Sequence, residues 1–280
     1  MLFVGWSPTQ DRRAGQAAGR EKPTGMKAPA FEYVRATTVA EASALLTGHG
    51  PDARLIAGGQ SLLPAMNLRL ASPSVLIDIG RIPGLDGIEV RDGVLRIGTL
   101  ARHETVLRDT SVARHAPLIT EALRHVAHPA IRARGTIGGN LAHADPASEL
   151  PACMLALDAV IEATSKRGTR RIAAEAFFTG LFQTNLEPDE MLTAIEIPLP
   201  VSPFFFQEIA RRSGDYAIVG LAAAGTRFAF FSVGDRPVLR QSRDALDLDP
   251  PGDLQATGAM RVHLAGVLRD RALRALEGSA

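Results

Sequence analysis

Residues 54–61 read RLIAGGQS, an apolar run that ends at the glycine pair Gly58-Gly59, and residues 136–140 read TIGGN, with a second pair at Gly138-Gly139. The apolar run is typical of a short buried strand, and the apolar stretch after the first pair is typical of a helix. Glycine lacks a Cβ and tolerates backbone conformations that are closed to other residues. Each motif therefore predicts a tight turn, and the first turn joins a strand to a helix.

Helix and strand patterns surround both motifs. Thr38-Val39-Ala40-Glu41 is a capping box, in which Thr38 caps a helix and Glu41 reaches back toward the preceding chain. Further helices are expected at 62–70, 118–126 and 147–157, and strands at 54–57, 75–79, 94–97, 159–163 and 191–197. Strands and helices do not alternate as regularly as a doubly wound parallel sheet requires, so the sequence predicts an α+β fold in two lobes.

The composition changes near residue 198. Pro198, Pro200 and Pro203 lie close together and lack amide donors, so they predict a linker. Strands are expected beyond it at 207–210, 218–224 and 227–233, before a final helix with Leu264, Leu268, Ala272 and Leu276 on one face. We therefore expect three parts, namely a disordered extension at 1–25, a main domain at 26–202 and a C-terminal domain at 203–280.

Composition narrows the possible roles. The 280 residues carry a formal net charge of +1, so no broad electrostatic field attracts nucleic acid. No apolar run reaches the roughly 18 residues that suggest a membrane span. Cys153 is the only cysteine, and one thiol cannot hold an iron–sulfur cluster by itself. A redox role would therefore need an organic cofactor or a partner chain.

The two glycine motifs also allow a second interpretation. Successive amides in such turns can point into one concavity and bind an anion, so two motifs could hold the two phosphates of a dinucleotide from both sides. Ser61, Thr136 and Asn140 add side-chain donors at the same places. Rossmann, P-loop and G-x-S-x-G motifs are absent, and the histidines lack metal-ligand spacing. The motifs alone leave the simple turn and the phosphate clamp both open.

Four segments, in order, resemble one protein family. AGGQSLLPAMNLRLA (57–71) and TIGGNLAHADPASELPA (136–152) resemble the two flavin loops of the carbon monoxide dehydrogenase medium-subunit family. These proteins are the FAD-binding subunits of molybdenum hydroxylases, related to the flavin domain of xanthine dehydrogenase. RRSGDYAIVGLAA (211–223) and DLQATGAMRVHLAGVLRDRAL (253–273) resemble the start and the final helix of the family's C-terminal domain. The resemblance implies a PCMH-type FAD-binding domain of two lobes, then a small α+β domain that looks shortened between Val238 and Asp253.

The resemblance also implies roles for individual residues. Both glycine motifs would cradle the FAD pyrophosphate through backbone amides. Glu149 stands where the family has an acid that helps to hold FAD, and Leu192 stands where the family lines the adenine side. Gln207 stands where some relatives have Lys, and Tyr216 stands where an aromatic ring covers the isoalloxazine. The other expected FAD-binding residues are Arg54, Leu55, Ile56, Ala57, Gly58, Gly59, Gln60, Ser61, Thr136, Ile137, Gly138, Gly139 and Asn140.

The family's chemistry sets the expected partners. The resemblance implies a cytoplasmic electron relay with non-covalent FAD and no catalytic residue or metal of its own. Its partners would be a [2Fe-2S] small subunit and a molybdopterin-binding large subunit, assembled as a dimer of heterotrimers. Two alternatives stay open, a free-standing flavin dehydrogenase or oxidase of the same fold and a scaffold subunit without redox function. Gln207 and the short C-terminal region are the features that favour the scaffold.

Overall fold

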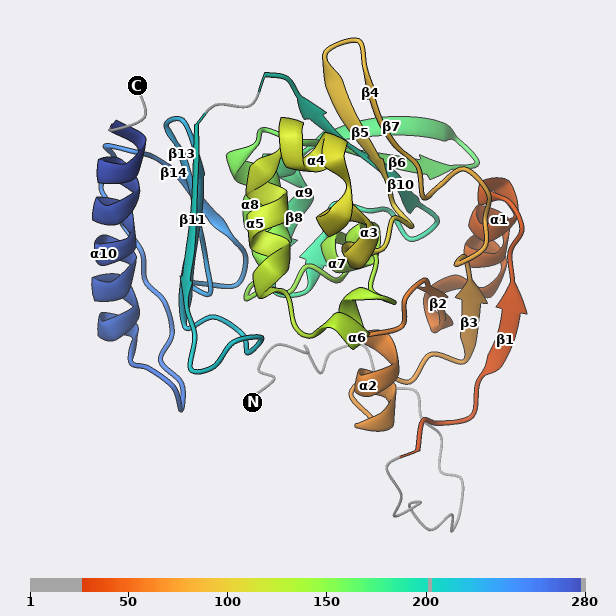
Figure 1. Ribbon diagram of the computed structural model, residues 1–280. Coiled ribbons are helices and arrows are strands. Elements are labelled where there is room, and N and C mark those ends of the chain that lie inside the picture. The colour runs from red at the N-terminus through yellow and green to blue at the C-terminus, as the bar shows by residue number, and fades with distance from the viewer. Residues whose placement is uncertain (1–26, 201–202, 278–280) are drawn as a thin grey trace.

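The computed structural model describes residues 27–200 and 203–277, so the expected extension at 1–25 lies outside the described residues. The chain forms a small lobe and a large lobe, followed by a C-terminal sheet with one helix on its outer side (Figure 1). This arrangement confirms the predicted α+β architecture. No helix within the described ranges is both long enough and apolar enough to cross a membrane.

The small lobe is a parallel sheet of three strands in the order β1-β3-β2, with α1 packed against it. Thr38 caps α1 by accepting the Glu41 amide at 3.1 Å, as predicted. The Glu41 carboxylate reaches back one residue further than a standard capping box, to the Thr37 amide at 2.7 Å. The elements are β1 (Glu32–Arg35), α1 (Val39–His49), the 3₁₀ turn η2 (Gly50–Asp52), β2 (Ala53–Ile56), α2 (Leu62–Asn67) and β3 (Val75–Asp78).

Helix α2 is shorter than the sequence suggested. The prediction extended it to Leu70, but the helix ends at Asn67. Arg69 adopts a left-handed backbone with φ of 60°, which a continuing α-helix does not allow. The amides of Leu70 and Ala71 then both bond to the Ala65 carbonyl, closing the end of the helix.

The large lobe is built on an antiparallel sheet of five strands in the order β4-β5-β10-β6-β7. Helices α5 and α8 pack together, and one continuous core joins them to this sheet and to the C-terminal sheet (Figure 1). The strands are β4 (Ile88–Arg91), β5 (Val94–Gly98), β6 (Val160–Ser165), β7 (Gly168–Ala173), β8 (Phe178–Gly180), β9 (Gln183–Thr184) and β10 (Met191–Pro198). The helices are α3 (His103–Arg108), α4 (Thr110–His115), α5 (Pro117–His125), α6 (Pro129–Arg132), α7 (Ile137–His143), α8 (Glu149–Ala156) and α9 (Ala174–Phe177).

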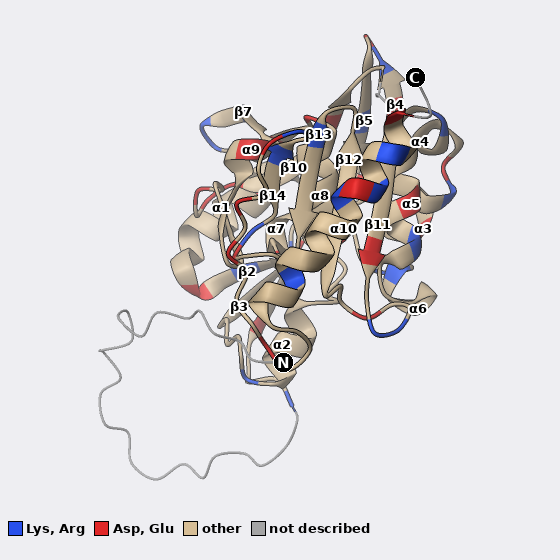
Figure 2. Cartoon of the chain, turned by 90° about the vertical axis from the view of Figure 1, so that its left-hand side faces the viewer, with Lys and Arg blue, Asp and Glu red and all other residues tan. Residues whose placement is uncertain are grey.

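The C-terminal part is an antiparallel meander, β11 (Phe204–Ile209), β12 (Val219–Ala224), β13 (Arg227–Phe231) and β14 (Val238–Gln241). Helix α10 (Gly258–Glu277) crosses its outer face (Figure 2), and Leu268 and Ala272 are buried there, as the periodicity predicted. Arg261 anchors the start of α10, because its buried guanidinium bonds to the Ser232 carbonyl at 3.1 Å and to the Asp253 carboxylate at 2.6 Å. The predicted linker is partly wrong, because Pro198 is the last residue of β10 and pairs with Val94. Pro200 and Pro203 lie between β10 and β11, and residues 201 and 202 lie outside the described residues.

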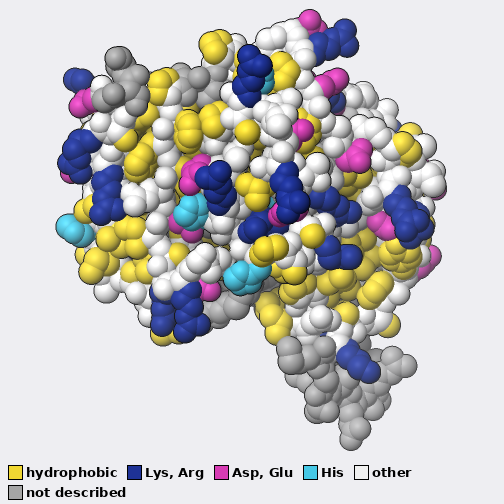
Figure 3. All heavy atoms as spheres, in the orientation of Figure 1, with side chains coloured by type: hydrophobic (Ala, Val, Ile, Leu, Met, Phe, Trp, Pro, Cys, Tyr) yellow, Lys and Arg dark blue, Asp and Glu magenta, His cyan; other side chains and the backbone are white. Residues whose placement is uncertain are grey.

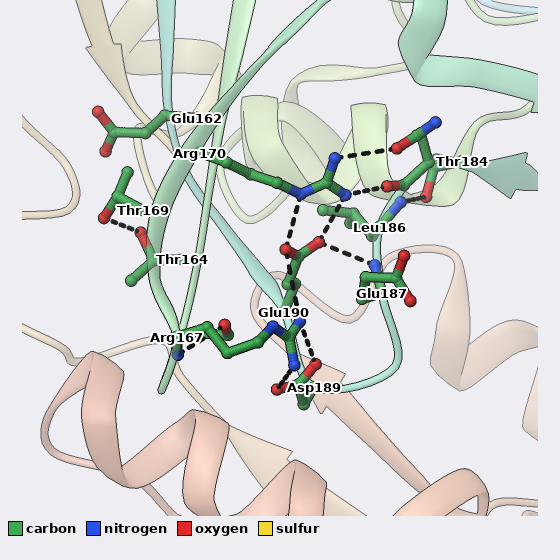
Figure 4. A network of polar contacts seen from close by, with 12 residues as sticks. Glu162, Thr164, Arg167, Thr169, Arg170, Thr184, Leu186, Glu187, Asp189 and Glu190 are labelled. Atoms are coloured by element: carbon green, nitrogen blue, oxygen red, sulfur yellow. Dashed lines mark hydrogen bonds and ion pairs between the residues drawn. The ribbon is translucent and has the colours of Figure 1, made fainter.

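A network of ion pairs holds the segment that leads into β10 (Figure 4). Arg170 on β7 donates to both carboxylate oxygens of the buried Glu190, at 2.7 and 2.8 Å. Arg167 donates to both oxygens of Asp189 in the same way, at 2.7 and 2.9 Å. The Ser43 hydroxyl on α1 donates to the Asp189 carbonyl at 3.0 Å. The network therefore joins the β6–β7 hairpin, the start of β10 and the small lobe.

Replacing Arg170 by methionine should lower the free energy of unfolding by about 1–3 kcal/mol, because the buried Glu190 carboxylate loses its bidentate partner and keeps, as a charged partner, only the Arg167 guanidinium at 3.8 Å. The hydrogen bond from Arg170 lowers the pKa of Glu190, so this stabilisation is present above the ordinary pKa of glutamate and disappears as the pH falls. Urea unfolding at neutral and acidic pH measures both effects. Arg124→Met, which breaks an exposed pair with Glu121 on α5, is the matched control and should cost at most about 1 kcal/mol. Equal losses in the two variants would contradict the prediction.

Candidate functional site

The first glycine motif forms the turn between β2 and α2, as predicted. Gly59 has φ of 69°, a left-handed conformation that favours glycine. Within the described part of the chain, the amides of Gly59, Gln60, Ser61 and Leu62 donate to no acceptor, and Ser61 does not cap α2 with its side chain. Four successive free donors at the start of a helix are suited to an anion. The turn therefore fits the phosphates of a dinucleotide.

The second glycine motif is not the tight turn that the sequence suggested. Gly138 and Gly139 lie in the first turn of α7, whose N-cap is Thr136. Their amides are already bonded, from Gly138 to the Thr99 carbonyl at 2.9 Å and from Gly139 to the Thr136 hydroxyl at 3.1 Å. The Ile137 amide likewise bonds to a carbonyl of the 99–102 loop. The first amides of this motif are therefore occupied. The motif can attract an anion only through the positive end of the α7 helix dipole and through its side chains.

The two motifs meet through main-chain atoms. A Cβ on Gly58 would lie 2.3 Å from the Arg134 carbonyl oxygen and 3.0 Å from the Gly135 Cα, so only glycine permits this contact. Arg134 and Gly135 immediately precede the second motif. A similar contact fixes the other side, where a Cβ on Gly138 would lie 1.7 Å from the Thr99 hydroxyl oxygen. The glycines thus bring the free amides of the first motif beside the start of α7.

Glu149 lies close to the second motif and is buried, with 7% of its surface exposed. It is the first residue of α8, after the N-cap Ser148. The Ser148 hydroxyl and the Asn140 amide group are bonded to each other, with contacts of 2.8 and 3.1 Å, so α8 is tied to α7 at this point. Burial raises the pKa of Glu149 from 4.5 to about 8, and the nearby Glu208 carboxylate adds to the shift. The site therefore contains an acid that is protonated near neutral pH.

The C-terminal domain supplies two side chains at this edge of the site. Tyr216 lies in the loop between β11 and β12 with 53% of its surface exposed, and partial burial followed by the Asp145 carboxylate raises its pKa. Glu208 on β11 is buried and pairs with His125 on α5 at 3.3 Å. This hydrogen bond raises the pKa of His125. The charged groups that act on Glu149 therefore come from both domains, with Glu208 on β11 and His125 on α5.

Three expected residues point elsewhere or are buried. The Arg54 guanidinium turns back to the Pro51 and Ala53 carbonyls, at 2.7 Å each. Leu192 is buried in the core of the large lobe, next to a bulge in the pairing of β10 with β6. Gln207 accepts a hydrogen bond from Arg271 of α10 at 3.2 Å, on the sheet face opposite to Glu208. The structure therefore does not bring the Gln207 side chain to the glycine motifs.

Sequence reasoning missed the loop between β5 and α3. Thr99 and Ala101 accept the first amides of the second motif, and Arg102 forms an isolated antiparallel bridge with Thr136. It also missed the His125–Glu208 pair, whose members lie far apart in sequence. No local pattern marks these residues, because their contacts form only when distant segments pack.

Comparison with known proteins identifies the class. Residues 29–200 match the family described as FAD binding domain in molybdopterin dehydrogenase. The chain belongs to this family, whose cofactor is FAD. It is 45% identical to the nicotine 6-hydroxylase medium subunit of Paenarthrobacter nicotinovorans over 197 residues, covering 70% of this chain and 69% of that protein. It is 40% identical to the carbon monoxide dehydrogenase medium chain of Afipia carboxidovorans over 198 residues, with the same coverage of 70% and 69%.

Solved structures extend the likeness beyond the matched domain. The chain resembles quinoline 2-oxidoreductase from Pseudomonas putida 86 with a TM-score of 0.85 and 36% identity. That match covers 90% of this chain and 99% of the other. The chain is thus an FAD-binding medium subunit of the molybdenum hydroxylase type, with a PCMH-type fold.

Substituting Gly58 by alanine should destabilise the chain by about 1–3 kcal/mol and weaken FAD binding, because the new Cβ displaces the Arg134 main chain. Thermal unfolding and titration with FAD, followed by flavin fluorescence, measure the two effects. Gly48→Ala in α1 is the control, since its Cβ meets no atom within 4 Å and alanine favours the helix. If the two variants melt and bind alike, the packing argument fails.

Replacing Glu149 by glutamine should stabilise the apo chain increasingly as the pH rises from about 4.5 to 8. With its pKa raised to about 8, the folded state binds a proton that the unfolded state loses above 4.5, so wild-type stability falls across this window. The difference should grow by at most about 1.4 kcal/mol per pH unit. Urea unfolding at pH 5, 6.5 and 8 tests this. Glu89→Gln, at an exposed position on β4, should show a constant difference, and a constant difference for Glu149→Gln would disprove the buried neutral acid.

Proposed function

We propose that this chain is the electron-transfer subunit of a molybdenum hydroxylase, passing electrons from iron–sulfur clusters of a small subunit to an external acceptor. The observation that carries the proposal is the set of free amides at 59–62, held against the start of α7. When bound, FAD supplies a group that accepts and releases electrons singly or in pairs. The relatives are named as medium subunits, which supports large and small partner subunits. We expect the large subunit to bind molybdopterin and the small one to hold [2Fe-2S] clusters, as the family resemblance implies.

The chain's own residues hold and orient the cofactor in this proposal. The amides of Gly59 to Leu62, which have no acceptor among the described residues, would hold the phosphate oxygens. Residues 136–140 begin α7 next to the segment that packs on Gly58, and Glu149 is joined to Asn140 through the Ser148 hydroxyl. Tyr216 provides a half-exposed aromatic ring in the loop between β11 and β12. The positions expected from the family resemblance, 54–61, 136–140, Glu149, Leu192, Gln207 and Tyr216, stay predictions for FAD contact. Gln207 would reach FAD only through its main chain, since its side chain bonds to Arg271.

The single cysteine supports a relay that depends on a partner. Cys153 is buried completely, and burial raises the pKa of its thiol, so it supplies no thiolate for metal or sulfur chemistry. The electrons would therefore enter from clusters in another chain. The relatives' names refer to nicotine, carbon monoxide and quinoline, although all share this fold. The proposal accordingly leaves substrate choice to the large subunit.

Purification of the full chain tests the proposal directly. We expect it to take up one FAD, to release it on denaturation because no covalent bond forms, and to show no turnover of small substrates alone. Co-expression with the genes beside it should give a complex in which substrate reduces the flavin. A chain that takes up no FAD would overturn the proposal, and one that takes up no FAD but still assembles would be a scaffold. Substrate turnover by the isolated chain would instead indicate a free-standing flavin enzyme.

A further inference from the structure

Arg102 lies at the junction of the two glycine motifs. It pairs with Thr136 through an isolated antiparallel bridge, which places its main chain beside the start of α7. Its guanidinium donates to the carbonyl oxygen of Arg134. The same oxygen packs against Gly58. The Arg102 side chain therefore bonds to the carbonyl that packs against Gly58, while its main chain lies beside the N-terminus of α7.

The charge around Arg102 is unbalanced. Burial and the positive charge of Arg134 lower the pKa of Arg102. Neither guanidinium forms an ion pair with any carboxylate in the residues that the structure describes. Asp78, which attracts Arg102 more weakly, already accepts hydrogen bonds from Tyr33, Arg35 and the Gly80 amide. Asp86, which is exposed, attracts Arg102 more weakly still. Two neighbouring cations that pair with no carboxylate among the described residues favour the binding of an anion.

Positive side chains gather on this face of the molecule. Figure 3 shows several blue side chains over α3, α7 and α6, next to the apolar side chains around α2. The single arginines of α3 and α6, Arg108 and Arg132, both pair with Glu104. Arg102 and Arg134, beside the glycine motifs, form no such ion pair within the described ranges.

We propose that Arg102, with Arg134 beside it, supplies the positive charge that binds the pyrophosphate of FAD. The inference rests on the proposed FAD binding and assigns a residue outside the glycine motifs to it. Backbone amides contribute only partial charges, whereas a pyrophosphate is fully anionic, so a guanidinium adds the attraction that the amides lack. A planar guanidinium also presents several donors to phosphate oxygens at once. The amides of 59–62 would then donate from one side of the pyrophosphate and Arg102 from another.

A purely structural role for Arg102 predicts different behaviour. In that case its bond to the Arg134 carbonyl would only hold the two motifs together. Its loss would weaken the binding of any flavin equally and would not depend on salt. An electrostatic role instead affects ligands that carry phosphate and decreases as salt screens the charges. Salt dependence and the comparison of FAD with riboflavin therefore separate the two roles.

The experiment uses the full apo chain with FAD and riboflavin titrations at low and high salt. We expect Arg102→Gln to weaken FAD binding about tenfold at low salt, and Arg134→Gln to weaken it less because that side chain is exposed. Both differences should shrink at high salt, and riboflavin, which lacks phosphate, should bind all variants equally. Arg102→Lys should restore part of the affinity. Arg114→Gln, an exposed change on α4, is the control and should bind FAD as the wild type does.

The outcomes separate this inference from the proposed function. A wild-type chain that binds no FAD overturns both. A wild type that binds FAD, with Arg102→Gln equally tight or equally weakened toward riboflavin, overturns only the role of Arg102. Should Arg102→Gln fail to fold by circular dichroism, Arg134→Gln decides the matter, because Arg102→Lys keeps the positive charge. Wild-type FAD affinity and salt dependence in Arg134→Gln would then disprove the proposal.

Discussion

The main-chain contact between Gly58 and the Arg134–Gly135 segment is the constraint on which the site depends. A Cβ at Gly58 would lie 2.3 Å from the Arg134 carbonyl oxygen, so the contact exists only because the residue has no side chain. It fixes the small lobe against the start of α7 and places four free amides at their junction. The glycine therefore acts as a packing residue first, and that packing positions the free amides that we propose for phosphate binding.

The second glycine pair also fixes the position of α7, but its amides are bonded whereas those that follow the first pair are free. Gly138 packs on Thr99 and its amide bonds to the Thr99 carbonyl, so the amide is consumed in holding α7 in place. One motif consequently offers free donors, while the other supplies the rigid helix start beside them. A site with its donors fixed before binding loses less conformational entropy when the ligand enters.

Burial of Glu149 links the site to the C-terminal domain. Helices α5 and α8 lie in one core with both large sheets, and α8 carries Glu149 into it. Two residues of the C-terminal domain interact with this region. The Glu208 carboxylate raises the pKa of Glu149, and Tyr216 interacts with Asp145 and Glu149. A buried acid without a cationic partner lowers stability, and residues of this kind concentrate at functional sites. Burial of Glu149, with the Glu208 carboxylate of the C-terminal domain adding to it, thus raises the pKa of a group close to the second glycine motif.

The sequence by itself determined the α+β class, the Thr38 cap of α1, the buried face of α10 and the turn at Gly58-Gly59, because each depends on neighbouring residues. The order of four matching segments also determined the family. Only the tertiary structure decided that Gly138-Gly139 begin a helix, because the acceptors of their amides include Thr99, which is distant in sequence. It likewise decided that Gln207 faces α10 and that Arg102 lies at the motif junction. Such contacts depend on which distant segments pack together, and no local pattern records that choice.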